Sequence, residues 1–161
     1  MDTRIAILIV GIVLGLASGV GAAPTVFVVP MDGQQEVPGP GDPDGTGTAV
    51  LSIDPEALTI GWNITVNDID LPITGAHIHQ APFGEAGPIV VDFDSQLSGT
   101  GLADPDLAAV LASPSSYYVN VHNAPYPAGA IRGQLGCPIP VPSALGLVVM
   151  GLVSLRLSRR R

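Results

Sequence analysis

Apolar and polar residues alternate through the middle of the chain, between residues 25 and 135. The clearest run is residues 58–66, where every second residue is apolar: Leu58, Ile60, Trp62, Ile64 and Val66. A period of two places these side chains on one face of a strand and leaves the other face polar. Similar runs predict further strands at residues 25–29, 49–53, 73–79, 89–93, 117–122 and 130–135. Glycine and proline punctuate the gaps, which favours a β-sandwich over a parallel α/β fold.

One segment of the middle region has a helical pattern instead. Asp104, Pro105 and Asp106 are residue types that favour the start of a helix. Apolar residues follow at helical spacing up to Leu111, so a surface helix of about two turns is expected between two strands. Residues 32–47 are rich in glycine, proline and acids, which predicts a long mobile loop.

The N-terminus has the order of residues that is typical of a secretory signal peptide. Arg4 is followed by an apolar run over residues 5–16 and by small residues up to Ala23. Cleavage is expected after Ala22, because cleavage one residue later would leave Pro24 at the first mature position. An uncleaved N-terminal anchor is the alternative.

The C-terminus combines proline, apolar and basic residues in a second recognisable order. A proline-rich stretch at residues 138–143 precedes an apolar run at residues 144–155, and arginines end the chain. This order resembles the PEP-CTERM sorting signals of exosortase-bearing bacteria, in which the positive residues stay on the cytoplasmic side. Val141 departs from that pattern, since the name-giving motif has glutamate there. An uncleaved single-span anchor is the alternative.

The two ends define the expected domain organisation and localisation. We expect a signal peptide at 1–22, one β-sandwich domain at 23–136 and a sorting signal or transmembrane anchor at 137–161. Under either alternative for the tail, the domain is exported to the cell surface, the outer envelope or the extracellular matrix. The membrane is then contacted through the terminal segments only.

The charge of the middle region argues against nucleic acid as a partner. The chain has no lysine, and between Ala23 and Gly136 thirteen carboxylates stand against Arg132 alone, which gives a net charge of −12. Nucleic acid is a poor partner for such a domain, because phosphate binding depends on lysine and arginine. Divalent cations would be attracted, although the charge also serves simply to keep an exported domain soluble. The single cysteine, Cys137, excludes an internal disulfide and a zinc site built from thiolates.

The three histidines fall in two predicted strands. His77 and His79 are two residues apart, so both project from one face of their strand. In the later strand, His122 shares a face with Tyr118 and Asn120, opposite the valines that point to the core. If the two strands pair, three imidazoles converge outside the core, and such a set suits copper or zinc. Candidate fourth ligands are Asp92, Asp94 or water; the alternative is that each ring only makes hydrogen bonds beneath a loop.

Several motifs of the chain, in order, resemble those of the CHRD (chordin-type) domain family. They are GQQEVP at 33–38, GTGTA at 45–49, GAHIH at 75–79, FGEAGPIV at 83–90, YVNVHN at 118–123 and YPAGAIRGQL at 126–135. Ala128 and Ala130 depart from the family, which tends to have glycine and glutamate there. Arg132 therefore lacks a carboxylate neighbour in its own strand, which argues against an ion pair.

The resemblance implies an extracellular module with an immunoglobulin-like or Greek-key β-sandwich. With the elements predicted above, the expected fold is all-β, an immunoglobulin-like or Greek-key antiparallel β-sandwich with one short helix, flanked by hydrophobic terminal helices. The strand with two histidines, followed by a glycine-rich loop, is also similar to copper/zinc superoxide dismutases, which implies copper ligation by His77, His79 and His122. The chain has too few histidines for a second metal site, and its negative charge would repel an anionic substrate, so dismutation is a minor alternative.

The function expected from these patterns is that of a non-enzymatic, exported cell-surface or matrix module that binds or adheres to an extracellular partner. The alternative is a copper- or zinc-binding protein that uses the three histidines. No catalytic residues are expected, because no nucleophile in the sequence has an assigned base. No cofactor other than copper or zinc is expected.

Overall fold

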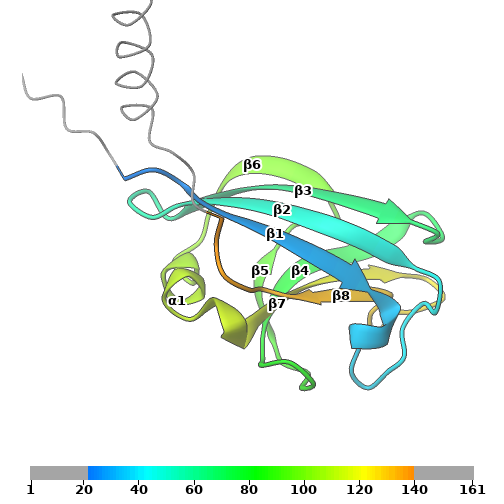
Figure 1. Cartoon of the computed structure of the whole chain (residues 1–161). Helices are drawn as coiled ribbons and strands as arrows, with labels where there is room; N and C mark the ends of the chain where they lie inside the picture. Colours follow the sequence, from blue (N-terminus) through cyan, green and yellow to red (C-terminus); the bar gives the residue numbers. More distant parts are fainter. Residues whose placement is uncertain (1–21, 140–161) are drawn as a thin grey trace, which may run out of the picture.

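The computed structural model describes residues 22–139, and within them eight strands make up most of the fold (Figure 1). The strands are β1 (Thr25–Asp32), β2 (Thr46–Asp54), β3 (Thr59–Asn67), β4 (Ile73–Gln80), β5 (Ile89–Asp92), β6 (Ser98–Ala103), β7 (Tyr117–Asn123) and β8 (Ile131–Gln134). One short helix, α1 (Leu107–Ala112), precedes β7, and single 3-10 turns occupy Gly33–Gln35 and Pro114–Ser116. The all-β class with one short helix is confirmed.

The strands form one antiparallel sheet in the order β5-β4-β7-β8-β1-β2-β3-β6. The sheet curls on itself, and its two halves are joined where β8 and β1 share a single residue pair, Arg132 with Asp32. Two halves therefore face each other as layers, β5-β4-β7-β8 on one side and β1-β2-β3-β6 on the other (Figure 1).

The core lies between the two halves and follows the alternation in the sequence. Phe27, Val29 and Met31 of β1 point inward, and Val119 and Val121 of β7 meet them from the other layer. The Trp62 ring stacks on Phe93 with centroids 4.5 Å apart. Burial of these apolar side chains is the main favourable term for the fold.

Strand β6 was not predicted from the sequence. Its residues, SGTGLA, show no apolar alternation, and it is held by pairing with β3. Gly99 packs directly beneath Trp62, where a Cβ atom would lie 2.2 Å from the indole ring. The strand is therefore specified by its partner and by close packing rather than by its own pattern.

The predicted helix exists but begins later than expected. It starts at Leu107, and the preceding acids form a turn in which the carboxylate of Asp104 accepts from the amide of Asp106. Residues 33–45 are tied down rather than free, because Gly41 donates to the carbonyl of Gly33 and Asp42 donates to the carbonyl of Ala130.

Both ends of the described part of the chain leave the domain at the same place. Ile139 donates from its amide to the carbonyl of Val26 at 2.7 Å, which brings the segment after β8 beside the start of β1 (Figure 1). Within residues 22–139, no helix is long and apolar enough to span a membrane. The expected signal peptide and nearly all of the sorting signal lie outside the described residues.

Candidate metal site

The three histidines meet on the face of β4 and β7 that points away from the core. The antiparallel register pairs His79 with Tyr118 and Gly75 with His122, so the three rings fall on neighbouring positions. Ring centroids are 5.1 Å apart for His77 and His122, and 5.9 Å apart for His79 and His122. One ring nitrogen from each histidine lies within 4.8 Å of those of the other two. The strand pairing that the sequence left open is therefore present.

Two of the rings are oriented by backbone carbonyls. Nδ1 of His79 lies 3.0 Å from the carbonyl oxygen of Gly87, and Nδ1 of His122 lies 3.2 Å from that of Pro127. A carbonyl oxygen only accepts, so in each ring Nδ1 carries the proton and Nε2 keeps its lone pair.

The third ring lies beside a carboxylate. Nε2 of His77 lies 3.5 Å from Oδ1 of Asp92, its register partner on β5. Asp92 is a candidate fourth ligand from the sequence, but it lies beside Nε2 of His77, and the ring nitrogen left without a partner is Nδ1. It therefore occupies the place of an orienting group, as carboxylates commonly do beside metal-binding histidines. Asp94 does not join the cluster, which among the described residues contains the three histidines alone.

The remaining ring nitrogens make a donor set that fits a transition-metal ion. Nδ1 of His77, Nε2 of His79 and Nε2 of His122 are buried and have no hydrogen-bond partner within the described chain. Zinc binds imidazole nitrogen at about 2.0–2.1 Å, so ligand nitrogens in a tetrahedral site lie about 3.4 Å apart. Small ring movements would bring the three nitrogens from within 4.8 Å to that spacing. The metal role of these residues remains a prediction.

The surroundings favour the neutral form of all three rings. Burial lowers the pKa of His77, and the nearby charge of Asp92 only partly opposes this. Burial also lowers the pKa of His79 and of His122. A neutral imidazole can donate its lone pair to a metal, whereas a protonated one cannot.

Close packing beside the rings requires a glycine. A Cβ atom on Gly75 would lie 2.6 Å from Cε1 of His77 and 3.3 Å from Cδ2 of His122. A larger residue there would push the His77 ring out of place. Gly75 stands two residues before His77 in the sequence. Its role in leaving room for the two rings becomes visible only when β4 is paired with β7.

Loops cover the polar face, so the histidines are less exposed than a position outside the core suggests. His79 is only 8% exposed, and Tyr118 beside it is 3% exposed. The Tyr118 ring stacks on His79 with centroids 4.9 Å apart and planes 14° apart. Sequence reasoning placed Tyr118 on this face but did not give it this contact.

A buried acid lies next to the histidine face. Glu36, from the loop after β1, accepts a hydrogen bond from Asn120 at 3.3 Å, and Asn120 is the register partner of His77. Burial raises the pKa of Glu36 to about 7, although the Asn120 hydrogen bond and the charge of Arg132 oppose the rise. Sequence reasoning missed this residue, because nothing local shows that its loop folds back over the sheet.

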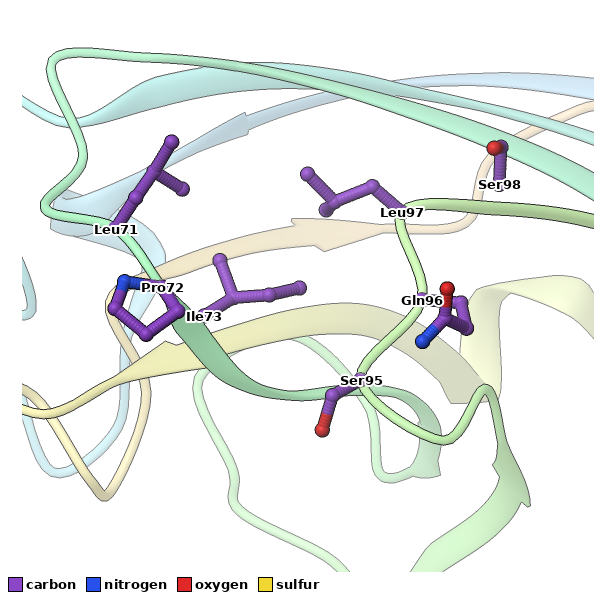
Figure 2. Close-up of a pocket in the computed structure, with 7 residues that line it drawn as sticks. All are labelled: Leu71, Pro72, Ile73, Ser95, Gln96, Leu97 and Ser98. Atoms are coloured by element: carbon purple, nitrogen blue, oxygen red, sulfur yellow. The ribbon is translucent and has the colours of Figure 1, made fainter.

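A separate hollow of about 700 Å³ opens between the β3–β4 connection and the segment before β6 (Figure 2). Leu71, Pro72 and Ile73 line one side, and the other side is mixed, with Ser95, Gln96, Leu97 and Ser98. The hydroxyl of Ser95 donates to the carbonyl of Thr74 at 2.8 Å. None of the lining side chains is an acid, a base or a histidine, so the hollow offers no general base to activate its serines.

The fold and the histidine face of β4 and β7 define a class of protein: an all-β domain module with three histidines on the polar side of its sheet. The family model of the CHRD domain matches residues 27–135, and the chain therefore belongs to the CHRD domain family. That family is not a known enzyme family. No curated protein and no solved structure matches the chain.

Glu36 gives the stability of the domain a specific pH dependence. Its folded pKa of about 7 exceeds the ordinary value of 4.5, so between these values the folded state binds more protons than the unfolded state. The contribution of Glu36 to the free energy of unfolding is thus full below pH 4.5 and is lost as the pH rises to about 7. Because glutamine does not ionise, Glu36→Gln lacks this dependence. Between about pH 5 and about pH 8, we expect the free energy of unfolding of the wild type to fall by up to about 3 kcal/mol more than that of the variant.

The measurement is urea unfolding of both proteins at about pH 5 and about pH 8, followed by the fluorescence of Trp62, the single tryptophan. The histidines and Asp42 titrate in both proteins, so the difference between the two isolates Glu36. A difference in stability that stays constant between the two pH values would contradict the assignment.

Proposed function

We propose that the chain is an exported, non-enzymatic binding module that acts at the cell surface or in the extracellular matrix. Membership of the CHRD family supports the module, and the signal-like N-terminus with the PEP-CTERM-like tail supports export. The expected partner is extracellular and not a nucleic acid, because a domain of net charge −12 repels phosphate.

The arrangement of the ends suits a tethered module. The described chain enters at Ala22 and leaves after Ile139 close to the same point, where Ile139 pairs with Val26. A domain held from that end would extend its opposite end, with the loop 33–45, away from the tether.

A second candidate function is the binding of one copper or zinc ion by His77, His79 and His122. The observation that favours it is the clustering of three rings, each of which has one buried nitrogen without a partner in the described chain. The opposite nitrogens of His79 and His122 are held by Gly87 and Pro127, and that of His77 lies near Asp92. Such a site would serve in metal storage or in protection against redox damage. The ion would supply Lewis-acid or redox chemistry, whereas the chain supplies neutral, oriented ligands.

Dismutation of superoxide is not proposed. An anionic substrate needs an electropositive approach, and the only positive side chain between Ala23 and Gly136 is the buried Arg132.

Export predicts the mass of the mature protein. Intact-mass spectrometry of the protein from the surface of its own cells should show an N-terminus at Ala23 and loss of the tail after the proline-rich stretch. A protein that keeps both Met1 and Arg161 and stays in the cytoplasm would contradict the proposal, whereas an intact tail on exported protein indicates the anchor.

Metal binding predicts a defined stoichiometry. Calorimetric titration of the metal-free full-length chain in mild detergent should show one copper(II) or zinc(II) ion per chain. The triple variant His77→Ala, His79→Ala, His122→Ala should bind at least about 100-fold more weakly, because it removes every ligand.

A matched control tests whether the many acids attract the ion instead. Asp68→Asn with Asp70→Asn removes two exposed carboxylates, and asparagine tolerates the positive φ of 55° at position 68. This double variant should keep the affinity of the wild type. Binding no tighter than about 1 mM, or equal binding by the folded triple variant, would rule out the site.

A further inference from the structure

We propose that Arg132 is a positioning residue for the three-histidine site, and that it acts through Tyr118 and through the loop of residues 81–88. This inference rests on the metal-binding function proposed above. Arg132 touches none of the three ring nitrogens that face one another, so its effect is on the placement of His79 rather than on ligation.

Arg132 is fully buried and is bound by backbone oxygens rather than by a carboxylate. It is 0% exposed, and its guanidinium donates to the carbonyl of Glu85 at 2.6 Å and to that of Pro82 at 3.0 Å. It also donates to Oε1 of Gln134 at 2.9 Å. No carboxylate of the described chain lies within salt-bridge distance of Arg132, as expected from the absence of an acid in its own strand.

The guanidinium also lies on the ring of Tyr118, with Cζ 3.5 Å from the ring centroid. β7 runs between β4 and β8, so Tyr118 is contacted by Arg132 from the β8 side and by His79 from the β4 side. A cation over an aromatic face is attracted by the ring, more strongly where water is excluded. Tyr118 thus transmits the position of Arg132 to the imidazole of His79.

The loop is the second route from Arg132 to His79. Residues 81–88 are fixed at Pro82 and Glu85 by Arg132, and the amide of Gly87 donates to the hydroxyl of Tyr118 at 3.3 Å. The carbonyl of the same Gly87 accepts from Nδ1 of His79. Arg132 therefore holds the loop that sets which nitrogen of His79 faces the other two rings.

This role needs a guanidinium and not merely a positive charge. The planar fork reaches three acceptors while its face lies on Tyr118, whereas a lysine ammonium is a point charge on a flexible stem. A buried cation is costly to desolvate unless its hydrogen bonds are made. A lysine that cannot reach all three acceptors would therefore displace the groups around it. Arg132→Lys is therefore the informative variant, and Arg132→Met removes the charge as well.

The test measures metal affinity and the electronic state of the bound ion in the full-length chain. Copper(II) and zinc(II) affinities come from competition with a chromophoric chelator, and the copper(II) ligand field comes from electron paramagnetic resonance. We expect Arg132→Lys to weaken binding by about 10–100-fold and to alter the copper spectrum, because outer-shell groups orient the ligands. Tyr118→Phe, which keeps the stacking ring but loses the bond to Gly87, should show a smaller loss.

A matched control separates positioning from a general loss of stability. Ile53 is fully buried in β2, in the other half of the sheet, so Ile53→Ala should lower the unfolding midpoint but leave affinity and spectrum unchanged. Wild-type affinity and spectrum in folded Arg132→Lys would overturn the proposal, as would an equal change in Ile53→Ala.

Failure of the metal site itself has a different signature. If the wild type binds neither ion, the proposed metal function fails. The positioning role is then decided in metal-free protein by the chemical shift of Cε1–H of His79, which the Tyr118 ring current moves. A shift unchanged in Arg132→Lys overturns the role in that case as well.

Discussion

The candidate site depends on one constraint, the antiparallel pairing of β4 with β7 in a register that places His79 opposite Tyr118. Because side chains alternate along a strand, this register sends Val119 and Val121 into the core and leaves all three imidazoles on the other face. A slip of one residue would bury the rings in the apolar layer. The hydrophobic interior and the histidine cluster are therefore two results of the same pairing.

The second feature is that the polar face is covered. Loops from three connections lie over it, and each brings a group that satisfies or orients a side chain beneath: Glu36 beside Asn120, Gly87 beside His79 and Pro127 beside His122. Covering removes water, which holds the imidazoles neutral and makes each hydrogen bond more specific in direction. The rings are therefore oriented by the chain itself, which is what the proposed metal site requires for a low cost of binding.

Much of this could be predicted from local pattern, and the rest depended on contacts distant in sequence. Alternation was enough for β3 and β7 and for the shared face of His77 and His79, because each strand carries its own period of two. It failed for β6, where Gly99 is specified by close packing against Trp62 on the neighbouring strand. It could not show that Arg132 contacts carbonyls 47 and 50 residues away, which depends on how the loop of residues 81–88 folds over the sheet. Nor could it show that Asp92 lies beside His77, which depends on the pairing of β5 with β4.

The pairing of β4 with β7 brings one ring nitrogen of each histidine within 4.8 Å of the other two. The most direct measurement is a long-range ¹H–¹⁵N spectrum of the histidine rings in metal-free protein at about pH 8, which reports the tautomer of each ring. We expect a proton on Nδ1 of His79 and of His122 and on Nε2 of His77, with each opposite nitrogen unprotonated. The reverse tautomers, or rapid exchange between both forms in all three rings, would contradict it.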